Sequence, residues 1–221
     1  WDVDELILLD ISRNREAYDI RRSDHKLKGS KNLLEFIERI AETCGVPLSF
    51  GGHVRSEEDI RIRIKHGADK VILNSAMRQA PETIRNSARL FGSQAIVVGI
   101  DYRVIENEPR VFTDHAAIDT GKTPQEWARF AEDLGAGEIF LNAVDRDGSA
   151  EGYDIETINK VVEAVEIPVI ACGGAGHVTH FRKCFLETRA SGIAAGNIFH
   201  FTENAYPRAK RNLRTVIDDI R

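Results

Sequence analysis

The side chain best suited to catalysis in this chain is a carboxylate that directly follows an apolar, strand-like run. Asp101 comes immediately after the run Ala95–Ile100. Partial burial at such a position disfavours the ionised carboxylate and raises its pKa towards the range that general acid-base catalysis uses. Asp101 is therefore our leading catalytic candidate. The alternative is that it caps its loop or pairs with Arg103, and the sequence leaves both open.

Two further carboxylates follow other strand-like runs. Asp147 lies in the segment Asp-Arg-Asp-Gly at 145–148, and Asp10 ends the run that begins at Leu6. An Asp-Gly pair is also a common turn, so a structural role for Asp147 stays open. His177 and His180 share a helical spacing but form no cluster of metal ligands, so we expect proton transfer without a metal or a cofactor.

Glycine pairs follow two of the other apolar runs. Because glycine lacks a Cβ, it lets backbone N–H groups approach an anion closely. Tight turning between a strand and a helix would explain one such pair equally well, and the presence of two favours ligands. The candidate phosphate cradles comprise Gly51, Gly52 and His53 in the first half of the chain and Gly173, Gly174 and Gly176 in the second.

Amide and small side chains follow the next strand-like run after each glycine pair. Asn74 and Ser75 do so in the first half, and Gly196 and Asn197 do so in the second. Each set would complete one phosphate site at the start of a helix. One cradle in each half predicts a substrate with a phosphate at each end.

Short apolar runs alternate with amphipathic stretches along the chain, which is typical of βα units around a parallel sheet. The predicted strands are Leu6–Asp10, Pro47–Phe50, Lys70–Leu73, Ala95–Ile100, Glu138–Asn142, Pro168–Ala171 and Gly192–Ala195. The predicted helices are Leu33–Thr43, Glu57–His66, Pro81–Leu90, Pro124–Leu134, Ile155–Val165, Val178–Leu186 and Tyr206–Ile220.

The two halves of the sequence resemble each other, since the segment 5–10 is echoed at 138–142 and the segment 46–52 at 167–174. This repeat predicts an α/β fold of the (βα)8 TIM-barrel type, built from two half-barrels. With seven visible strands, we expect one domain over residues 1–221 whose first βα unit is absent from the chain. An open, doubly wound sheet is the alternative.

Two long inserts follow predicted strands, at Ser12–Ser30 and Tyr102–Gly121. Both lie after strand ends, on the face where a barrel keeps its active site. The first mixes basic and acidic residues and is either a lid over an anionic substrate or a solvated loop. The second reads as a hairpin of Val104–Glu106 and Arg110–Phe112 around Asn107-Glu108-Pro109.

The composition limits the classes of function. The chain of 221 residues is 42% hydrophobic and has a formal net charge of -5, which argues against nucleic acid as a partner. No apolar run approaches the length of a membrane span. Cys44, Cys172 and Cys184 are odd in number and lie in or beside apolar segments, so we expect free thiols and a cytoplasmic location.

Six segments, all in the same order, resemble a known family. They are Val-Gly-Ile-Asp at 98–101, Gly-Ala-Gly-Glu at 135–138, Asp-Arg-Asp-Gly at 145–148, Gly-Tyr-Asp at 152–154, Cys-Gly-Gly-Ala-Gly at 172–176 and Phe-His-Phe at 199–201. The chain resembles the cyclase subunit of imidazole glycerol phosphate synthase. In that family, ammonia from a glutaminase partner passes through the barrel and attacks a bisphosphorylated ribulosyl aminoimidazole carboxamide, which yields imidazole glycerol phosphate and a purine precursor.

The resemblance implies roles for individual residues. Asp101 would be the catalytic acid and Asp147 an assisting carboxylate. The resemblance also implies an ammonia gate at the opposite end of the barrel, formed by a ring of charged residues: Glu5, Lys70 and Glu138. The same residues could equally form a salt-bridged barrel floor. The implied phosphate-binding positions are Asn74, Ser75, Gly148, Gly174, Gly196 and Asn197. From their places at the strand ends, we also expect the substrate- and phosphate-binding residues to include Asp10, Gly52, His53, Asn142 and Gly173.

The sequence also departs from the family pattern. His53 replaces a glycine, and Asn142 and Asn197 stand where hydroxyl residues are usual; the family's other catalytic Asp lies on the first strand, which this chain lacks. These departures keep two alternatives open. One is a paralogue that delivers glutaminase-derived ammonia to a separate amidotransferase in surface-sugar synthesis. The other is a non-catalytic subunit that only activates a glutaminase.

Overall fold

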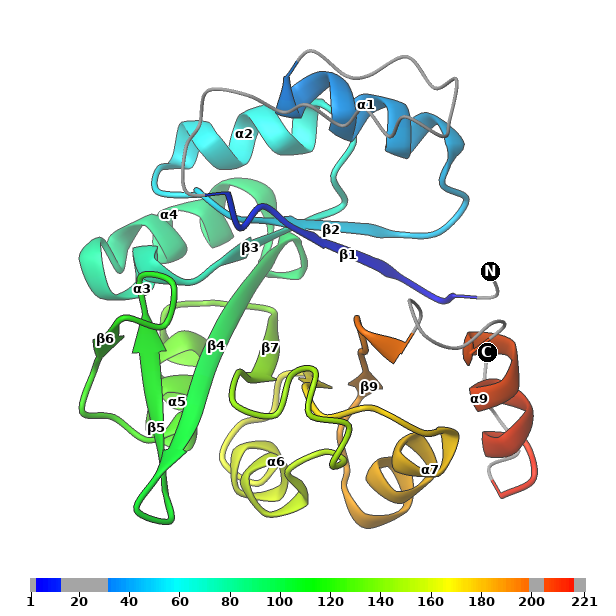
Figure 1. The fold of residues 1–221 in the computed structure, drawn as a ribbon. Coiled ribbons are helices and arrows are strands. Elements are labelled where there is room, and N and C mark those ends of the chain that lie inside the picture. Colours follow the sequence, from blue (N-terminus) through cyan, green and yellow to red (C-terminus); the bar gives the residue numbers. More distant parts are fainter. Residues whose placement is uncertain (1–2, 13–31, 199–204, 217–221) are drawn as a thin grey trace.

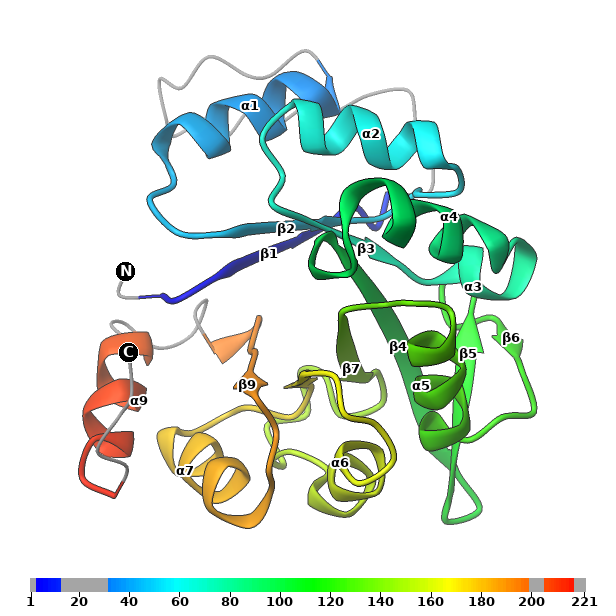
Figure 2. The same ribbon diagram turned by 180° about the vertical axis from the view of Figure 1, so that it is seen from behind.

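A computed structural model describes residues 3–12, 32–198 and 205–216 of the chain. Its centre is a curled sheet surrounded by helices (Figures 1 and 2). The predicted insert Ser12–Ser30 falls almost entirely outside the described residues, as does the segment 199–204. Among the described residues, none of the helices combines the length and the apolar character that crossing a bilayer would require.

The sheet contains parallel strands in the order in which they occur in the sequence. The seven described strands of this path form six parallel pairs, each between neighbours in the order. They are β1 (Leu6–Leu9), β2 (Leu48–Gly51), β3 (Lys70–Leu73), β4 (Ile96–Ile105), β7 (Glu138–Ala143), β8 (Val169–Cys172) and β9 (Gly192–Ile193). A doubly wound sheet reverses its strand order at a switch point, so this sequential order contradicts that alternative and fits a barrel-type sheet.

The helices lie on the outside of the curve (Figure 2). They are α1 (Leu33–Thr43), α2 (Glu57–Lys65), α3 (Ser75–Gln79), α4 (Glu82–Phe91), α5 (Pro124–Asp133), α6 (Ile155–Val162), α7 (Val178–Glu187) and α9 (Ala205–Leu213), with a short 3-10 turn at Ser93–Ala95. Side-chain caps fix five of the described starts, and those of α1 and α7 are Asn32 and His177. Ser56 and Thr123 each form a capping box, and Asp154 accepts a hydrogen bond from the Thr157 N–H.

Alternate residues of each strand face two different layers of side chains. The outer layer packs against the helices and includes Val71, Val98 and Ile139. Among the described residues, the inner layer is formed by strand residues and by Ala194, which follows β9. Its members are Ile72, Val97 and Phe140, with Ile7, Ile170, Cys172 and Ala194 packed against them. The inside of the curve is therefore apolar at mid-height, as in the filled interior of a small barrel.

The predicted hairpin after β4 is present. Strand β4 continues to Ile105 and pairs antiparallel with β5 (Glu108–Thr113), which pairs with β6 (Ile118–Asp119). Glu106 and Asn107 both have positive φ, as a tight two-residue turn requires. The predicted strand Ala95–Ile100 therefore ends too early, because the hairpin extends β4 to Ile105.

Candidate active site

Asp101 lies at the carboxyl end of the inner face of the sheet, between two amide side chains. Asn74 Nδ2 donates a hydrogen bond to Asp101 Oδ2 over 3.0 Å, and Asn142 Nδ2 donates one to Oδ1 over 2.9 Å. The three residues come from the ends of neighbouring strands, because β3 pairs with β4 and β4 with β7. Each carboxylate oxygen is thus held in place from one side.

Burial raises the pKa of Asp101 above its ordinary value, against the opposing effect of the two amides. Arg103 and His115 lie near enough to oppose the rise electrostatically. Arg103 also stacks over the ring of Phe112, with 5.2 Å between the guanidinium carbon and the ring centroid. Because Asp101 holds its proton more readily than an exposed Asp, it is suited to act as an acid.

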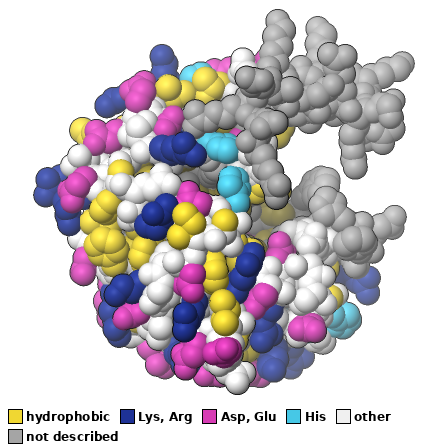
Figure 3. Space-filling view, turned by 60° about the vertical axis from the view of Figure 1, so that its left-hand side comes forward, with side chains coloured by type: hydrophobic (Ala, Val, Ile, Leu, Met, Phe, Trp, Pro, Cys, Tyr) yellow, Lys and Arg dark blue, Asp and Glu magenta, His cyan; other side chains and the backbone are white. Residues whose placement is uncertain are grey.

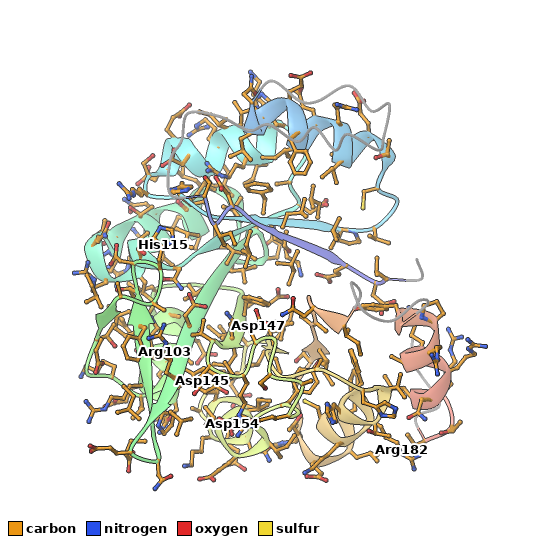
Figure 4. All side chains as sticks on the ribbon, viewed as in Figure 1. Arg103, His115, Asp145, Asp147, Asp154 and Arg182 are labelled. Carbon is orange, nitrogen blue, oxygen red and sulfur yellow. The ribbon has the colours of Figure 1, made fainter. Side chains whose placement is uncertain are left out.

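The second carboxylate, Asp147, lies in the segment between β7 and α6, which also carries Asp145 and Asp154 (Figure 4). Asn197 Nδ2 is 3.5 Å from Asp147 Oδ1 and would lie 3.0 Å from a Cβ at Gly148. The negative charges of Asp147 and Asp101 both raise the pKa of the Cys172 thiol, so both carboxylates lie in the surroundings of Cys172. The structure therefore brings Asp147, Gly148 and Asn197 together.

Each of the two predicted cradles contains a residue whose backbone conformation and close contacts favour glycine. Gly52 has φ +96°, and a Cβ there would lie 2.2 Å from the carbonyl oxygen of Asp10. Gly174 has φ +95°, and a Cβ there would lie 2.1 Å from the carbonyl oxygen of Gly152. Gly196, in contrast, has open space around its Cβ position, so packing does not demand a glycine there.

His53 continues the first glycine pair in the left-handed region, with φ 53°. Its Nε2 lies 2.8 Å from the carbonyl oxygen of Ser12 and 3.7 Å from Asp10 Oδ2. The Asp10 side chain also accepts a hydrogen bond from the Ser12 N–H. His53 and Asp10 therefore lie together at the end of β1 and hold the start of the insert.

Sequence reasoning missed the groups that hold the loop after β5. Asp114, His115 and Ala116 all have positive φ, and the Asp114 N–H donates to Ser75 Oγ. Arg78 donates to the Asp114 carboxylate over 2.8 Å. This anchoring brings His115 near enough to Asp101 to lower the pKa of its carboxyl group electrostatically, and the ring of His53 lies 6.1 Å from that of His115. Three successive left-handed residues of these types carry no sequence signal that would have revealed them.

The charged residues predicted for the opposite end also meet. Lys70 Nζ donates to Glu5 over 3.0 Å and to Glu138 over 2.8 Å. Lys70 and Glu138 are the first residues of β3 and β7, whereas Asn74 and Asn142 lie at the carboxyl ends of the same strands. Since the strands are parallel, the ion-pair cluster and Asp101 lie at opposite rims of the sheet.

Cys172 ends β8 and faces the inside of the curve, at the same rim as Asp101. Burial raises the pKa of Cys172 to about 12 and that of Cys184 to about 11. In the folded protein at pH 8 we therefore expect iodoacetamide to alkylate both thiols at least roughly a hundredfold more slowly than in urea. Mass spectrometry of digested, alkylated protein measures this, and rapid modification of Cys172 in the folded state would contradict its burial.

Comparison with known proteins places this geometry in a family. A model of a family described as histidine biosynthesis protein matches residues 3–205. The chain belongs to this family. Individual relatives confirm its resemblance to the cyclase subunit of imidazole glycerol phosphate synthase. They also confirm the prediction that the chain is a lyase-type enzyme.

Three relatives carry the name imidazole glycerol phosphate synthase subunit HisF. The one from Metallosphaera sedula is 41% identical over 197 residues, which is 89% of this chain and 74% of the relative. The one from Alkaliphilus metalliredigens is 40% identical and covers 96% of this chain and 80% of the relative. The one from Hydrogenobaculum is 40% identical and covers 96% and 79%.

Proposed function

We propose that this family member catalyses the cyclase reaction of histidine biosynthesis. In this reaction, ammonia and a bisphosphorylated ribulosyl aminoimidazole carboxamide give imidazole glycerol phosphate and a purine precursor. The observation that carries the proposal is the Asp101 carboxylate, held between Asn74 and Asn142 at the rim where the two glycine-rich turns also lie. The names of the three relatives support the same reaction.

Asp101 supplies the proton that the cyclisation requires. Burial raises its pKa, which favours the protonated form more than in an exposed Asp, and the two amides keep the carboxyl group at one position above the apolar inner layer. Asp147 assists from the neighbouring segment, where Asn197 lies against its carboxylate. The chemistry is therefore proton transfer by side chains at the carboxyl rim.

The two phosphates bind at the two glycine-rich turns. One cradle is formed by the turn after β2 and the start of α3, and the other by the turn after β8 and the segment after β9. Free backbone N–H groups at such turns bind phosphate oxygens well. The proposed contacts for the first phosphate are Gly52, His53, Asn74 and Ser75; those for the second are Gly148, Gly173, Gly174, Gly196 and Asn197. Asp10 and Asn142 line the space between them.

The sheet that carries these residues is proposed to be part of a (βα)8 barrel built from two half-barrels. The sequential path from β1 to β9 and the helices on its outer face support this. Lys210 of α9 donates to Asp4 over 2.7 Å, so the two ends of the path lie near each other. One additional strand between β9 and β1 would close the ring.

Ammonia is proposed to come from a glutaminase partner that docks at the rim where Lys70, Glu5 and Glu138 meet. The ion pairs of Lys70 with both carboxylates would form a gate to the apolar interior. We place the complex in the cytoplasm, because the three cysteines are free thiols and suit a reducing compartment.

Replacing Lys70 by Met should uncouple ammonia delivery from cyclisation. The change leaves two carboxylates facing each other, without the cation that holds them in place. Turnover with glutamine and the partner should fall about tenfold or more, the effect of losing a charge-assisted hydrogen bond, while turnover with ammonium salt changes little. Steady-state rates with both nitrogen sources measure this, and exposed Lys65→Met is the control. An equal fall with both sources would contradict the gate.

The relatives give no support to the alternative paralogue that feeds a surface-sugar amidotransferase. Supplying the purified protein with the bisphosphorylated substrate and ammonium salt tests the proposal. Formation of imidazole glycerol phosphate is the expected result. Failure of the protein to form it, with or without the glutaminase, would refute the cyclase activity and favour a subunit that only binds and activates its partner.

A further inference from the structure

The side-chain oxygen of Asn142 is buried and has no hydrogen-bond partner among the described residues. The other end of the same amide is engaged, because Nδ2 donates to Asp101 Oδ1 over 2.9 Å. An ionised carboxylate only accepts hydrogen bonds, so while Asp101 is ionised this contact fixes which end of the amide carries the nitrogen. The Asn142 oxygen is thus held in a defined direction without a donor to meet it.

An unsatisfied buried acceptor destabilises a protein unless a ligand or water satisfies it. Asn74 provides a comparison within the same site. It holds the other oxygen of Asp101 with an equivalent hydrogen bond of 3.0 Å, yet its own oxygen is not among the buried groups without a partner. Fixing the Asp101 carboxylate therefore does not by itself require an orphaned oxygen, and Asn142 has a second role.

The position of Asn142 indicates what the donor is. Along β7, side chains two residues apart point to the same face, so Glu138, Phe140 and Asn142 form one inner column. Glu138 belongs to the ion-pair cluster at the amino rim, and Phe140 belongs to the apolar inner layer. Asn142 is thus the first polar group of this column above the apolar layer, where a small polar molecule coming through the interior would first find an acceptor.

We propose that the Asn142 side-chain oxygen binds the ammonia that arrives from the interior and orients it towards the substrate, a role that rests on the proposed cyclase function. Ammonia has three N–H donors and one lone pair. When one N–H bonds to Asn142, the lone pair points away from the amide, into the mouth. The neutral amide also leaves ammonia unprotonated, whereas a carboxylate would favour ammonium, which has no lone pair for attack.

Two substitutions that share one shape test the role of this oxygen. Asn142→Thr keeps a hydroxyl that can donate to Asp101 and accept an N–H, whereas Asn142→Val has neither group. The KM for ammonia should be roughly tenfold higher in the Val variant than in the Thr variant, the effect of one hydrogen bond. The KM for the bisphosphorylated substrate should differ by a smaller factor than the KM for ammonia, because both variants leave the two phosphate cradles intact.

The same pair at Asn74 is the matched control. Asn74→Thr and Asn74→Val remove an equivalent contact with Asp101, so they disturb the carboxylate to a similar degree. Between these two variants the KM for ammonia should be equal, and only kcat and the KM for the phosphorylated substrate should respond. An effect on the ammonia KM of the same size at both positions would show that Asn142 acts only through Asp101, and would overturn the proposal.

Thermal unfolding verifies that each variant is folded. If the Val protein does not fold, Asn142→Ser and Asn142→Ala give a second pair. Equal ammonia KM values within folded, active pairs at position 142 would refute ammonia binding and leave a water molecule as the partner of the oxygen. That result leaves the cyclase activity intact. Absence of turnover by the unsubstituted protein would overturn the proposed function, and this inference with it.

Discussion

Replacing Asp101 by Asn should lower cyclase turnover by a factor of about 10² to 10⁴, which is the usual contribution of general acid-base catalysis. The amide has nearly the same shape and can still accept one of the two hydrogen bonds that now come from Asn74 and Asn142. It cannot donate a proton as an acid does. Ammonia-dependent formation of imidazole glycerol phosphate measures the loss, and a rate within about threefold of the original would exclude Asp101 as the acid.

The same substitution should not destabilise the protein at neutral pH. Burial raises the pKa of Asp101 above its unfolded value of 3.8, so keeping the carboxylate ionised opposes folding. This destabilisation develops as the pH rises from 3.8 through the folded pKa, and it disappears below 3.8, where both states are protonated. The Asn variant should therefore unfold at the same or a higher temperature at pH 7, and the difference should vanish in acid.

Asp145→Asn is the matched control for this prediction. Asp145 lies near the same strand ends and loses the same charge, but it is exposed, and its Oδ2 accepts a hydrogen bond from the Val104 N–H, which an Asn oxygen can also accept. Turnover should stay within about twofold. A large loss here as well would indicate that the net charge of the rim, and not the Asp101 proton, governs the rate.

Replacing Gly174 by Ala should destabilise the protein by about 3 kcal/mol or more and remove the second phosphate cradle. The Gly174 backbone has φ +95°, and a Cβ would meet the backbone carbonyl of Gly152, which itself accepts a hydrogen bond from Arg146. The Gly152 N–H also donates to the Gly174 carbonyl, so neither backbone can move without breaking that contact. Chemical denaturation and the KM for the bisphosphorylated substrate measure the two effects.

Gly45→Ala is the control for conformational cost. Gly45 is exposed, and nothing lies within 4 Å of the position that a Cβ would take. Its substitution should change the free energy of unfolding by less than about 1 kcal/mol and leave the substrate KM unaltered. If Gly174→Ala behaved like Gly45→Ala in both assays, the close backbone approach at the second cradle would be refuted.

Much of the fold could be predicted because local signals agreed with the final structure. Strand β3 and helix α1 have the residue ranges that periodicity predicts, and the capping box at Ser56 sets the start of α2. The ends of other elements differ from the predicted ones where tertiary contacts determine them. The hairpin extends β4, and α3 is a single five-residue turn, too short to produce a periodic pattern.

The candidate site divides in the same way. Asp101 and the glycine turns could be found because a carboxylate after a buried strand and paired glycines are visible in sequence. His115 and Cys172 could not, since their positions near Asp101 depend on how the loop after β5 is anchored and on the register between β7 and β8. Charged side chains of both signs are interspersed on the face shown in Figure 3, so surface charge gives little guidance to the site.

The crystal structure of the Asp101→Asn variant with the bisphosphorylated substrate bound tests the central claim most directly. We expect one phosphate on the backbone around Gly52 and Ser75, the other around Gly174 and Asn197, and the ribulosyl chain passing over position 101. Both phosphates on one cradle, or a substrate bound near Lys70 at the opposite rim, would contradict it.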